Sequence, residues 1–456
     1  MTSAPDSLPE PTIVPKPRAS WREALTVYLQ PRVLIVLLLG FSSGLPLALS
    51  GSTLLVWMTE SGVNLRTIGL FALVGTPYTL KFLWAPLVDA LHVPLFTRRF
   101  GRRRGWLVFS QLLLIAAILL LALTDPAKSP LFVALGALLV AAMSSTQDIV
   151  VDAFRVESLP EEEQAAGMAS YVAAYRIGML VSTAGALFMV SAYEGTGLPR
   201  GTAWMWGYAT MAAMVLIGTV TALCATEPAQ SARAEAATGA DTALQRVTKA
   251  AIGALSEFLA RKDAWAALAF VVLFKFTDAF SGTMTAPFVI DLGFTRNDYA
   301  AIVKGVGLAA TLLGGFAGGF VARRYSLPTS LWIGGVLQAV ANLSFSWLAI
   351  VGVNQWALAF AITAENFTSA IGTVIFVAYL SALCKNPLHT ATQYALLTAL
   401  AAVGRTYLSA SAGYVAATTG WPLFFAICVV VAVPSLILLV WLQRRGHFDT
   451  LEPVRI

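Results

Sequence analysis

Long apolar runs recur along the chain from Val33 to Leu442 and constrain its fold more than any other feature. Most of them exceed the roughly 18 residues that a helix needs to cross the hydrocarbon core of a bilayer. Inside that core only helices and closed barrels satisfy their backbone hydrogen bonds, and the sequence lacks the alternating pattern of barrel strands. Charged residues make up only 12% of the chain, whereas a soluble domain carries about 25%. The sequence therefore predicts an all-α membrane protein with many spans.

The apolar runs are numerous enough for about twelve spans. We place them at 33–58, 66–90, 106–124, 130–153, 167–190, 203–225, 264–290, 298–321, 329–351, 356–382, 391–417 and 420–443. The longest connection separates six runs from six, which is typical of transporters built from two repeated halves. The expected units are a Pro-rich N-terminal tail (1–32), an N-terminal six-helix half (33–225), a linker (226–263), a C-terminal six-helix half (264–443) and a C-terminal tail (444–456).

The charges between the spans predict how the chain is oriented in the membrane. The net charge of +6 comes from basic residues in the connections rather than from a soluble basic domain, so nucleic acid is not an expected partner. An even number of spans puts both termini on one side, and most Lys and Arg residues outside the spans fall on that side. Arg66, Lys128, Arg200 and Arg296 fall on the other side. The positive-inside rule therefore predicts cytoplasmic termini in a bacterial inner membrane.

The linker carries a helical pattern of its own. Apolar residues recur at helical spacing from Leu244 to Phe258, with charged residues between them. This pattern predicts an amphipathic helix that lies on the cytoplasmic leaflet.

Carboxylates inside the predicted spans are the candidates for proton coupling. Ionisable groups are costly there and face either a cavity or a partner. Asp148, Glu365 and Asp278 are such carboxylates, and the three histidines of the chain fall outside the spans. Asp148 can equally be the structural partner of a neighbouring Arg or Lys. Asp278 lies one turn from Lys275, so a local ion pair is an equally good interpretation of that position.

Cations in the spans slightly outnumber the carboxylates, which favours an anionic substrate. The candidates for substrate binding are Lys81, Tyr78, Gln147, Arg176, Lys275, Lys304, Gln393 and Arg405. Aromatic faces stack on sugar rings, and side-chain amides form hydrogen bonds with hydroxyl groups. Packing within the bundle, or a place in the aromatic belt at the membrane interface, is the competing interpretation for Tyr78.

Candidates for gating lie toward the cytoplasmic side. The connection after the second span carries Asp89, Arg98, Arg99, Arg102 and Arg103. The end of the eighth span repeats part of this pattern of charged residues. Small residues over 314–319 are followed there by Arg323 and Arg324, but the acid is missing. In the fourth span Asp152 and Arg155 lie toward the cytoplasmic end and predict a gate or an ion pair. This pattern resembles the signature of the major facilitator superfamily, in which an acid and an Arg pair hold the cytoplasmic side closed. Close helix packing is the alternative explanation for the glycines of 314–319.

Six stretches, spread over both halves, carry a more specific resemblance. They are GLPLAL (44–49), KFLWAPLVD (81–89), FGRRRGW (100–106), QDIVVDA (147–153), YRIGML (175–180) and ATQYALLTAL (391–400). As a set they resemble the AmpG-type muropeptide permeases of the major facilitator superfamily. In this resemblance Asp148 and Asp152 match the acids of the family's fourth span.

The resemblance implies a function as well as a fold. Its members import N-acetylglucosaminyl-1,6-anhydro-N-acetylmuramyl peptides from periplasm to cytoplasm, driven by the proton gradient. These fragments arise in peptidoglycan recycling, which is linked to β-lactamase induction and antibiotic resistance. The partners implied are the anhydromuropeptide, protons and the bilayer, with no cofactor beyond the gradient, no metal and a monomeric chain.

Other functions remain open at this point. A related facilitator of another anionic solute, such as acetyl-coenzyme A, has the same general pattern. A membrane-embedded enzyme acting on lipid-linked sugars needs clustered catalytic groups at one interface, and the outer connections offer almost none. A receptor that binds fragments without moving them is a third possibility, although the repeated halves favour transport.

Overall fold

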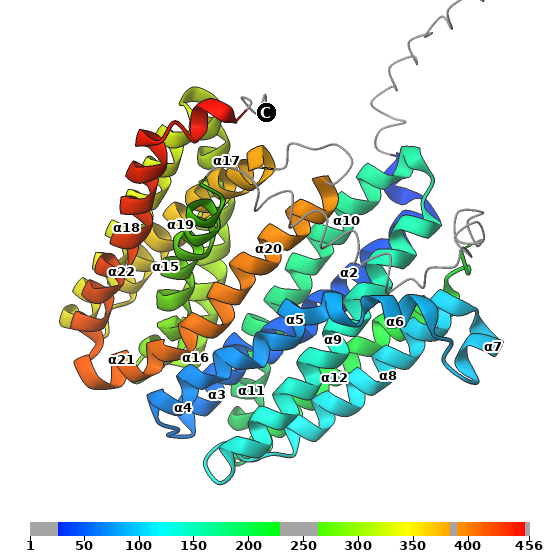
Figure 1. The fold of residues 1–456 in the computed structure, drawn as a ribbon. Helices are drawn as coiled ribbons and strands as arrows, with labels where there is room; N and C mark the ends of the chain where they lie inside the picture. Colours follow the sequence, from blue (N-terminus) through cyan, green and yellow to red (C-terminus); the bar gives the residue numbers. More distant parts are fainter. Residues whose placement is uncertain (1–25, 229–262, 384–389, 452–456) are drawn as a thin grey trace, which may run out of the picture.

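The computed structural model describes residues 26–228, 263–383 and 390–451, and all regular structure within these ranges is helical (Figure 1). The predicted all-α class is therefore confirmed. The expected linker helix falls within 229–262, outside the described residues.

The N-terminal half contains six membrane-length segments. They are α2 (Pro31–Leu49) with α3 (Ser52–Glu60); α4 (Leu65–Leu70), η2 (Phe71–Gly75), α5 (Thr76–Leu80), η3 (Lys81–Leu83) and α6 (Ala85–Ala90); α8 (Arg102–Ala122), after the short α7 (Phe96–Phe100); α9 (Pro130–Ser158); α10 (Glu161–Leu180), the π-helical η4 (Val181–Gly185) and α11 (Ala186–Gly195); and α12 (Arg200–Cys224).

The C-terminal half has the same number of segments. They are α15 (Ala264–Asp291); α16 (Arg296–Asp298), the π-helical η5 (Tyr299–Val306) and α17 (Gly307–Arg324); α18 (Leu327–Val351); α19 (Gln355–Leu383); α20 (Thr390–Tyr407), η6 (Leu408–Ser411) and α21 (Ala412–Thr419); and α22 (Trp421–Arg444).

Ten of these segments are long and apolar enough to cross a membrane as helices in the described part of the chain. The other two, 65–90 and 390–419, are broken into shorter helices. Pro77 and Pro86 lie in the first turns of α5 and α6, because proline lacks the N–H that a helix interior requires and fits the first turn. The twelve expected spans thus correspond to ten long helical segments and two broken ones.

Glycines let neighbouring helices within each half approach closely. A Cβ at Gly44 of α2 would meet the backbone of Tyr175 in α10, and one at Gly314 of α17 would meet the backbone of Phe367 in α19. Gly318 faces α19 in the same way, whereas Gly315 has nothing within 4 Å in the described structure. Close packing therefore explains Gly314 and Gly318.

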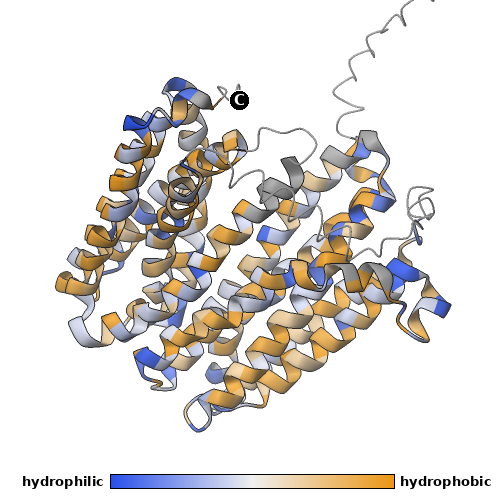
Figure 2. Ribbon diagram, viewed as in Figure 1, coloured by the Kyte–Doolittle hydropathy of each residue, from blue (hydrophilic) through white to orange (hydrophobic). Residues whose placement is uncertain are grey.

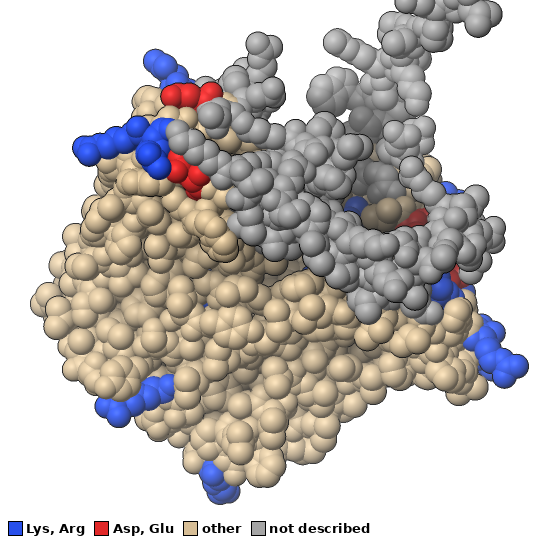
Figure 3. Space-filling model, viewed as in Figure 1, with Lys and Arg blue, Asp and Glu red and all other residues tan. Residues whose placement is uncertain are grey.

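The outer surface of the bundle has the polarity expected in a bilayer. Apolar residues cover the outward faces of the helices (Figure 2), and on the face shown in Figure 3 the described charged side chains gather at the ends and leave a broad uncharged band between them. Large exposed apolar side chains such as Phe316, Trp356 and Ile437 lie on this surface. A surface of this kind is stable in lipid rather than in water.

The two halves meet at one end of the bundle. We call this the distal end, which carries Glu60, Glu194 and Arg296, and we call the other, which carries Arg32 and Arg444, the terminal end. Contacts between the halves join α3 to α15, α4 to α21 and α11 to α16. The short helices α3, α4, α16 and α21 lie toward the lower edge of Figure 1, whereas the C-terminus lies at the top. Gly69 of α4 and Gly413 of α21 pack backbone to backbone there.

Candidate functional site

A cavity of about 610 Å³ lies between the two halves. Both halves contribute to its lining: Tyr78 of α5 and Arg176 of α10 on one side, and Lys304 of η5, Glu365 of α19 and Arg405 of α20 on the other. The structure thus brings together five residues that sequence reasoning selected separately. A volume of this size is in the usual range for small-molecule sites.

The cavity is electropositive. Arg176, Lys304 and Arg405 contribute three cations, against the one carboxylate of Glu365. Among the described residues Arg176 and Arg405 form no ion pair or hydrogen bond, and Lys304 Nζ lies 5.4 Å from the ring centroid of Tyr299. Glu365 Oε2 accepts a hydrogen bond of 2.8 Å from Asn366 Nδ2. Guanidinium groups without protein partners are available to bind carboxylates of a ligand.

A second polar cluster lies within the N-terminal half. Asp148 of α9 is buried, and Gln147 Nε2 donates a hydrogen bond of 3.2 Å to Ser43 Oγ of α2. Lys81 of η3 is close enough to interact electrostatically with both Asp148 and Asp152. Lys81, Gln147 and Asp148 are not among the residues that line the cavity.

Two tyrosines connect this cluster with the cavity. Tyr78 lines the cavity and also lies within electrostatic range of Asp148. Tyr175 of α10 lies within electrostatic range of Asp148 and of the cavity cations Arg176 and Arg405, which belong to opposite halves. A change of charge at Asp148 therefore changes the electrostatic potential at the cavity wall.

Lys275 and Asp278 of α15 form the local ion pair that was one of the two interpretations of their spacing. Lys275 Nζ lies 2.8 Å from Asp278 Oδ2 and donates to Thr373 Oγ1 at 2.9 Å. Ser369 Oγ donates to Asp278 Oδ1 at 2.6 Å. Neither residue lines the cavity. This pair joins α15 to α19 within the C-terminal half.

Two arginines of the predicted gate, Arg102 and Arg103, share a described partner in the N-terminal half. Arg103 Nη2 lies 2.5 Å and Arg102 Nη2 3.3 Å from Glu157 Oε1 of α9. The backbone N–H groups of Arg103 and Arg104 donate to the carboxylate of Glu227 at 2.8 and 3.0 Å, which caps the first turn of α8. Sequence reasoning selected the arginines but missed Glu157 and Glu227.

The other candidates for gating and binding form no comparable ion-pair cluster among the described residues. Arg98 and Arg99 are exposed in α7. Asp152 and Arg155 are electrostatic neighbours on α9, as their spacing predicts, without an ion pair within 4 Å. Asp89 lies in α6 and Gln393 in α20, but their side chains lie outside the described part of the structure.

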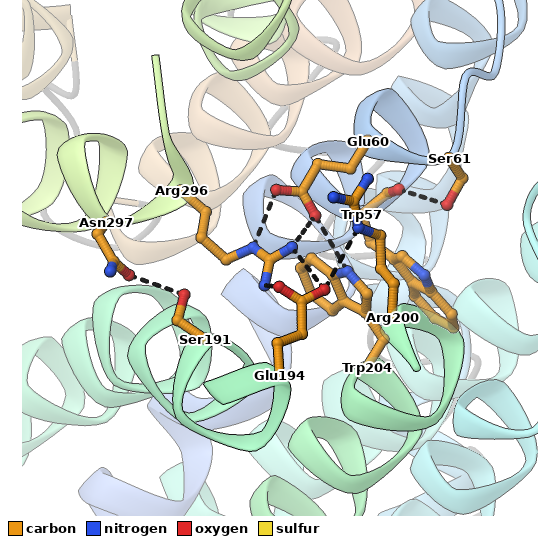
Figure 4. Close-up of polar contacts among 9 residues, drawn as sticks. All are labelled: Trp57, Glu60, Ser61, Ser191, Glu194, Arg200, Trp204, Arg296 and Asn297. Atoms are coloured by element: carbon orange, nitrogen blue, oxygen red, sulfur yellow. Dashed lines mark hydrogen bonds and ion pairs between the residues drawn. The ribbon is translucent and has the colours of Figure 1, made fainter. Parts of the chain in front are cut away.

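Glu60, Glu194 and Arg296 form a cluster that sequence reasoning missed. They come from the ends of α3 and α11 and the start of α16, and Figure 4 shows that the two carboxylates converge on the guanidinium. An acid at the end of each of two spans and an Arg at the start of a third were visible signals. That they meet depends on how the halves are arranged in space.

Comparisons with known proteins agree with this architecture. Residues 36–405 match the Major Facilitator Superfamily. The anhydromuropeptide permease of Escherichia coli K12 is 39% identical over 433 residues, which cover 95% of this chain and 83% of the relative. The chain belongs to the AmpG-like permeases of the major facilitator superfamily. This permease is a transporter rather than an enzyme.

More distant relatives show the same family and fold. The putative transporter AmpG 4 of Rickettsia felis is 34% identical to this permease, over 91% of its chain and 97% of the relative. A crystal structure of a D-xylose-proton symporter superposes with a TM-score of 0.65 at 14% identity, covering 90% of this chain and 97% of the symporter. A POT family transporter in complex with 5-aminolevulinic acid gives a TM-score of 0.67 at 12% identity and covers 90% and 96%.

Proposed function

We propose that this permease imports anhydromuropeptides from the periplasm to the cytoplasm across a bacterial inner membrane, driven by protons. The observation that carries the proposal is the electropositive cavity between the halves, with Arg176 contributed by one half and Lys304 and Arg405 by the other. The relative from Escherichia coli K12 that is called an anhydromuropeptide permease supports this cargo. The cell would use such import for peptidoglycan recycling.

The distribution of charge supports cytoplasmic termini. The terminal end carries Arg102, Arg103 and Arg104 at the start of α8 and Arg444 and Arg445 at the end of α22. By the positive-inside rule this end faces the cytoplasm and the distal end faces the periplasm. The contacts of α3 with α15, of α4 with α21 and of α11 with α16 then lie at the periplasmic end of the cavity.

Different cavity residues would recognise the carboxylates and the sugar rings of a muropeptide. Arg176, Lys304 and Arg405 would hold the lactyl or peptide carboxylates, since charge-assisted hydrogen bonds are the strongest that a neutral-pH site can offer. Tyr78 would face the sugar rings. Cations from opposite halves repel each other when no ligand is bound. An anion between them would remove this repulsion and allow the halves to close around the cargo.

Proton coupling would run through carboxylates in the bundle. Asp148 lies in the N-terminal half beside Lys81, and Glu365 lies on the cavity wall. Taking up a proton at either group changes the charge that the neighbouring cations and the ligand experience. Both halves of the cavity come from one chain, so a monomer would be sufficient for transport.

Uptake into proteoliposomes tests the proposal. Radiolabelled anhydro-disaccharide tripeptide is offered with and without an inward proton gradient, and accumulation above equilibrium is expected only with the gradient. Arg405→Gln should raise the KM about tenfold or more, because one charge-assisted contact to the cargo is lost. Lys128→Gln changes an exposed loop cation instead and should leave uptake unchanged.

Each other outcome points to a different function. Saturable uptake that equilibrates without accumulation would describe a facilitator without proton coupling. If the folded protein takes up no muropeptide, the cargo is another anion, and acetyl-coenzyme A becomes the next one to test.

A further inference from the structure

The distal end carries an ion cluster that bridges the two halves (Figure 4). Arg296 Nε and Nη2 lie 2.9 and 2.6 Å from the two carboxylate oxygens of Glu60. Arg296 Nη1 and Nη2 lie 2.7 and 3.3 Å from the two oxygens of Glu194. One guanidinium from the C-terminal half thus binds two carboxylates of the N-terminal half, each through two contacts. This geometry uses most of the donors that a guanidinium has.

The local backbone holds Arg296 in place for these contacts. Thr295 caps the N-terminus of α16, where its hydroxyl accepts from the N–H of Asp298, and the carboxylate of Asp298 accepts from the N–H of Thr295. This capping box fixes the first residue of the segment. Next along the chain, Asn297 Oδ1 accepts a hydrogen bond of 2.8 Å from Ser191 Oγ of α11, a second contact between the halves.

Aromatic side chains shield the Arg296–Glu60 pair of the cluster from water, whereas the side chain of Glu194 is 28% exposed. The side chain of Arg296 is 6% exposed and that of Glu60 12%. The guanidinium carbon lies 5.5 Å from the ring centroid of Trp204, whose Nε1 donates to Glu60 Oε2 at 3.1 Å. Trp57 stacks on Trp204 with ring centroids 5.5 Å apart. Water screens a charge pair in such surroundings much less than it screens a surface pair.

The cluster lies on the distal side of the cavity. Leu55 of α3, Thr183 of η4 and Tyr299 of η5 line the cavity. Glu60, Glu194 and Arg296 follow or precede these residues on the same helical segments, each on the side toward the distal end. A ligand entering the cavity from that end has to pass the plane in which the three charges meet.

Separating the halves at this end would leave the charges poorly compensated. Glu194 would keep Arg200, whose Nε lies 3.3 Å from Glu194 Oε1 but whose side chain is 61% exposed. Glu60 would keep the N–H of Trp204, and Arg296 would keep no carboxylate of this cluster. The bonds across the interface therefore favour the state in which the distal end is closed.

We propose that Arg296, Glu60 and Glu194 form the periplasmic gate of this permease, and that the bonds between them must break each time the cavity opens toward the periplasm. The cluster is separate from Arg102 and Arg103 at the terminal end, whose guanidinium groups have their described partner, Glu157, in the same half. Only the name of the compartment rests on the proposed function.

A distance measurement across the gate tests this directly. Spin labels are attached at Thr196→Cys and Val353→Cys, exposed positions in opposite halves at the distal end, after the native cysteines Cys224, Cys384 and Cys428 are replaced by serine. Double electron–electron resonance then reports how far the halves are apart. Arg296→Gln should raise the ratio of open to closed molecules by about tenfold or more.

An exchange variant separates the gate from a general loss of stability. Glu60→Arg with Arg296→Glu keeps two carboxylates and one guanidinium in the cluster and should restore the short distance. Lys128→Gln is the matched control. It breaks the exposed Lys128–Asp125 pair of 3.2 Å at the same end but within one half, and should change nothing.

The proposal is overturned if Arg296→Gln and Glu60→Gln both keep the wild-type distance distribution. If Arg296→Gln cannot be obtained folded, Glu60→Gln and Glu194→Gln decide the matter, because each leaves Arg296 one carboxylate and should give an intermediate shift. The distances are measured without cargo, so they hold even if the cargo is not a muropeptide. Labelling of Thr196→Cys by an impermeant thiol reagent in intact cells shows separately which compartment the gate faces.

Discussion

The three carboxylates considered for proton coupling differ in their hydrogen-bond partners. Asp278 has fixed partners in Lys275 and Ser369, and Glu365 accepts a hydrogen bond from Asn366. Asp148 has one oxygen, Oδ1, that is buried without a hydrogen-bond partner in the described part of the chain. A carboxylate with a vacant oxygen can accept a proton without losing an existing contact. Asp148 is therefore the carrier we expect in the N-terminal half.

Asp148→Asn tests this assignment. The amide keeps the size of the side chain but cannot take up and release a proton, so accumulation driven by the gradient should be lost. Exchange of labelled for unlabelled cargo needs no net proton movement and should continue. Comparing uptake with exchange in proteoliposomes checks the expectation. Unchanged accumulation would remove Asp148 from the coupling mechanism, and loss of both activities would indicate a structural role.

Sequence reasoning found charged residues more readily than their partners. Arg102 and Arg103 stood out as a basic cluster, but Glu157 lies on another helix and meets them only through packing. In the same way Arg296 appeared only as a basic residue on the outer side. The rotation of each helix about its axis decides such pairings, and a single sequence does not determine it.

At the scale of helices, the spans themselves were predictable because their length is set by the bilayer. The expected 264–290 and 356–382 became α15 (Ala264–Asp291) and α19 (Gln355–Leu383). The breaks were less predictable, since proline acts differently by position. Pro46 and Pro287 lie inside α2 and α15, whereas Pro77 and Pro86 lie in the first turns of new helices.

The broken segments 65–90 and 390–419 meet at the distal end through two glycines, and this contact yields a prediction. A Cβ at Gly413 would overlap the carbonyl oxygen of Leu65 and approach Gly69 closely. Gly413→Ala should therefore push α4 and α21 apart and destabilise the closed state, by about 1 to 3 kcal/mol. A lower thermal unfolding temperature and a larger open fraction in the spin-label measurement are expected.

Gly315→Ala is the matched control for this change. Gly315 lies in α17 and has nothing within 4 Å of an added Cβ in the described structure. Alanine is the better helix former there, so neither the unfolding temperature nor the open fraction should move toward the values of Gly413→Ala. Equal behaviour of the two variants would show that the Gly69–Gly413 contact does not hold the halves together.

At the scale of the whole molecule, transport requires that the contacts between the halves are temporary. Thr79 of α5 and Thr406 of α20 form one of these contacts, with 3.0 Å between their Oγ1 atoms. Thr406 lines the cavity, and both threonines are buried at this contact. A receptor that only binds its ligand could keep this contact permanently, whereas an alternating-access transporter has to break it in every cycle.

A disulfide at the Thr79–Thr406 contact distinguishes a receptor from an alternating-access transporter. Thr79→Cys with Thr406→Cys, in the background without native cysteines, places two thiols at a separation from which a disulfide can form with little movement of the backbone. Oxidation should abolish uptake, and reduction should restore it, while cargo binding measured by equilibrium dialysis persists in the oxidised form. Each single cysteine variant should transport normally under both conditions. Full uptake by a protein shown to be cross-linked would mean that these halves do not separate here during transport, and the alternating-access mechanism would have to be replaced by one in which the cargo passes a fixed interface.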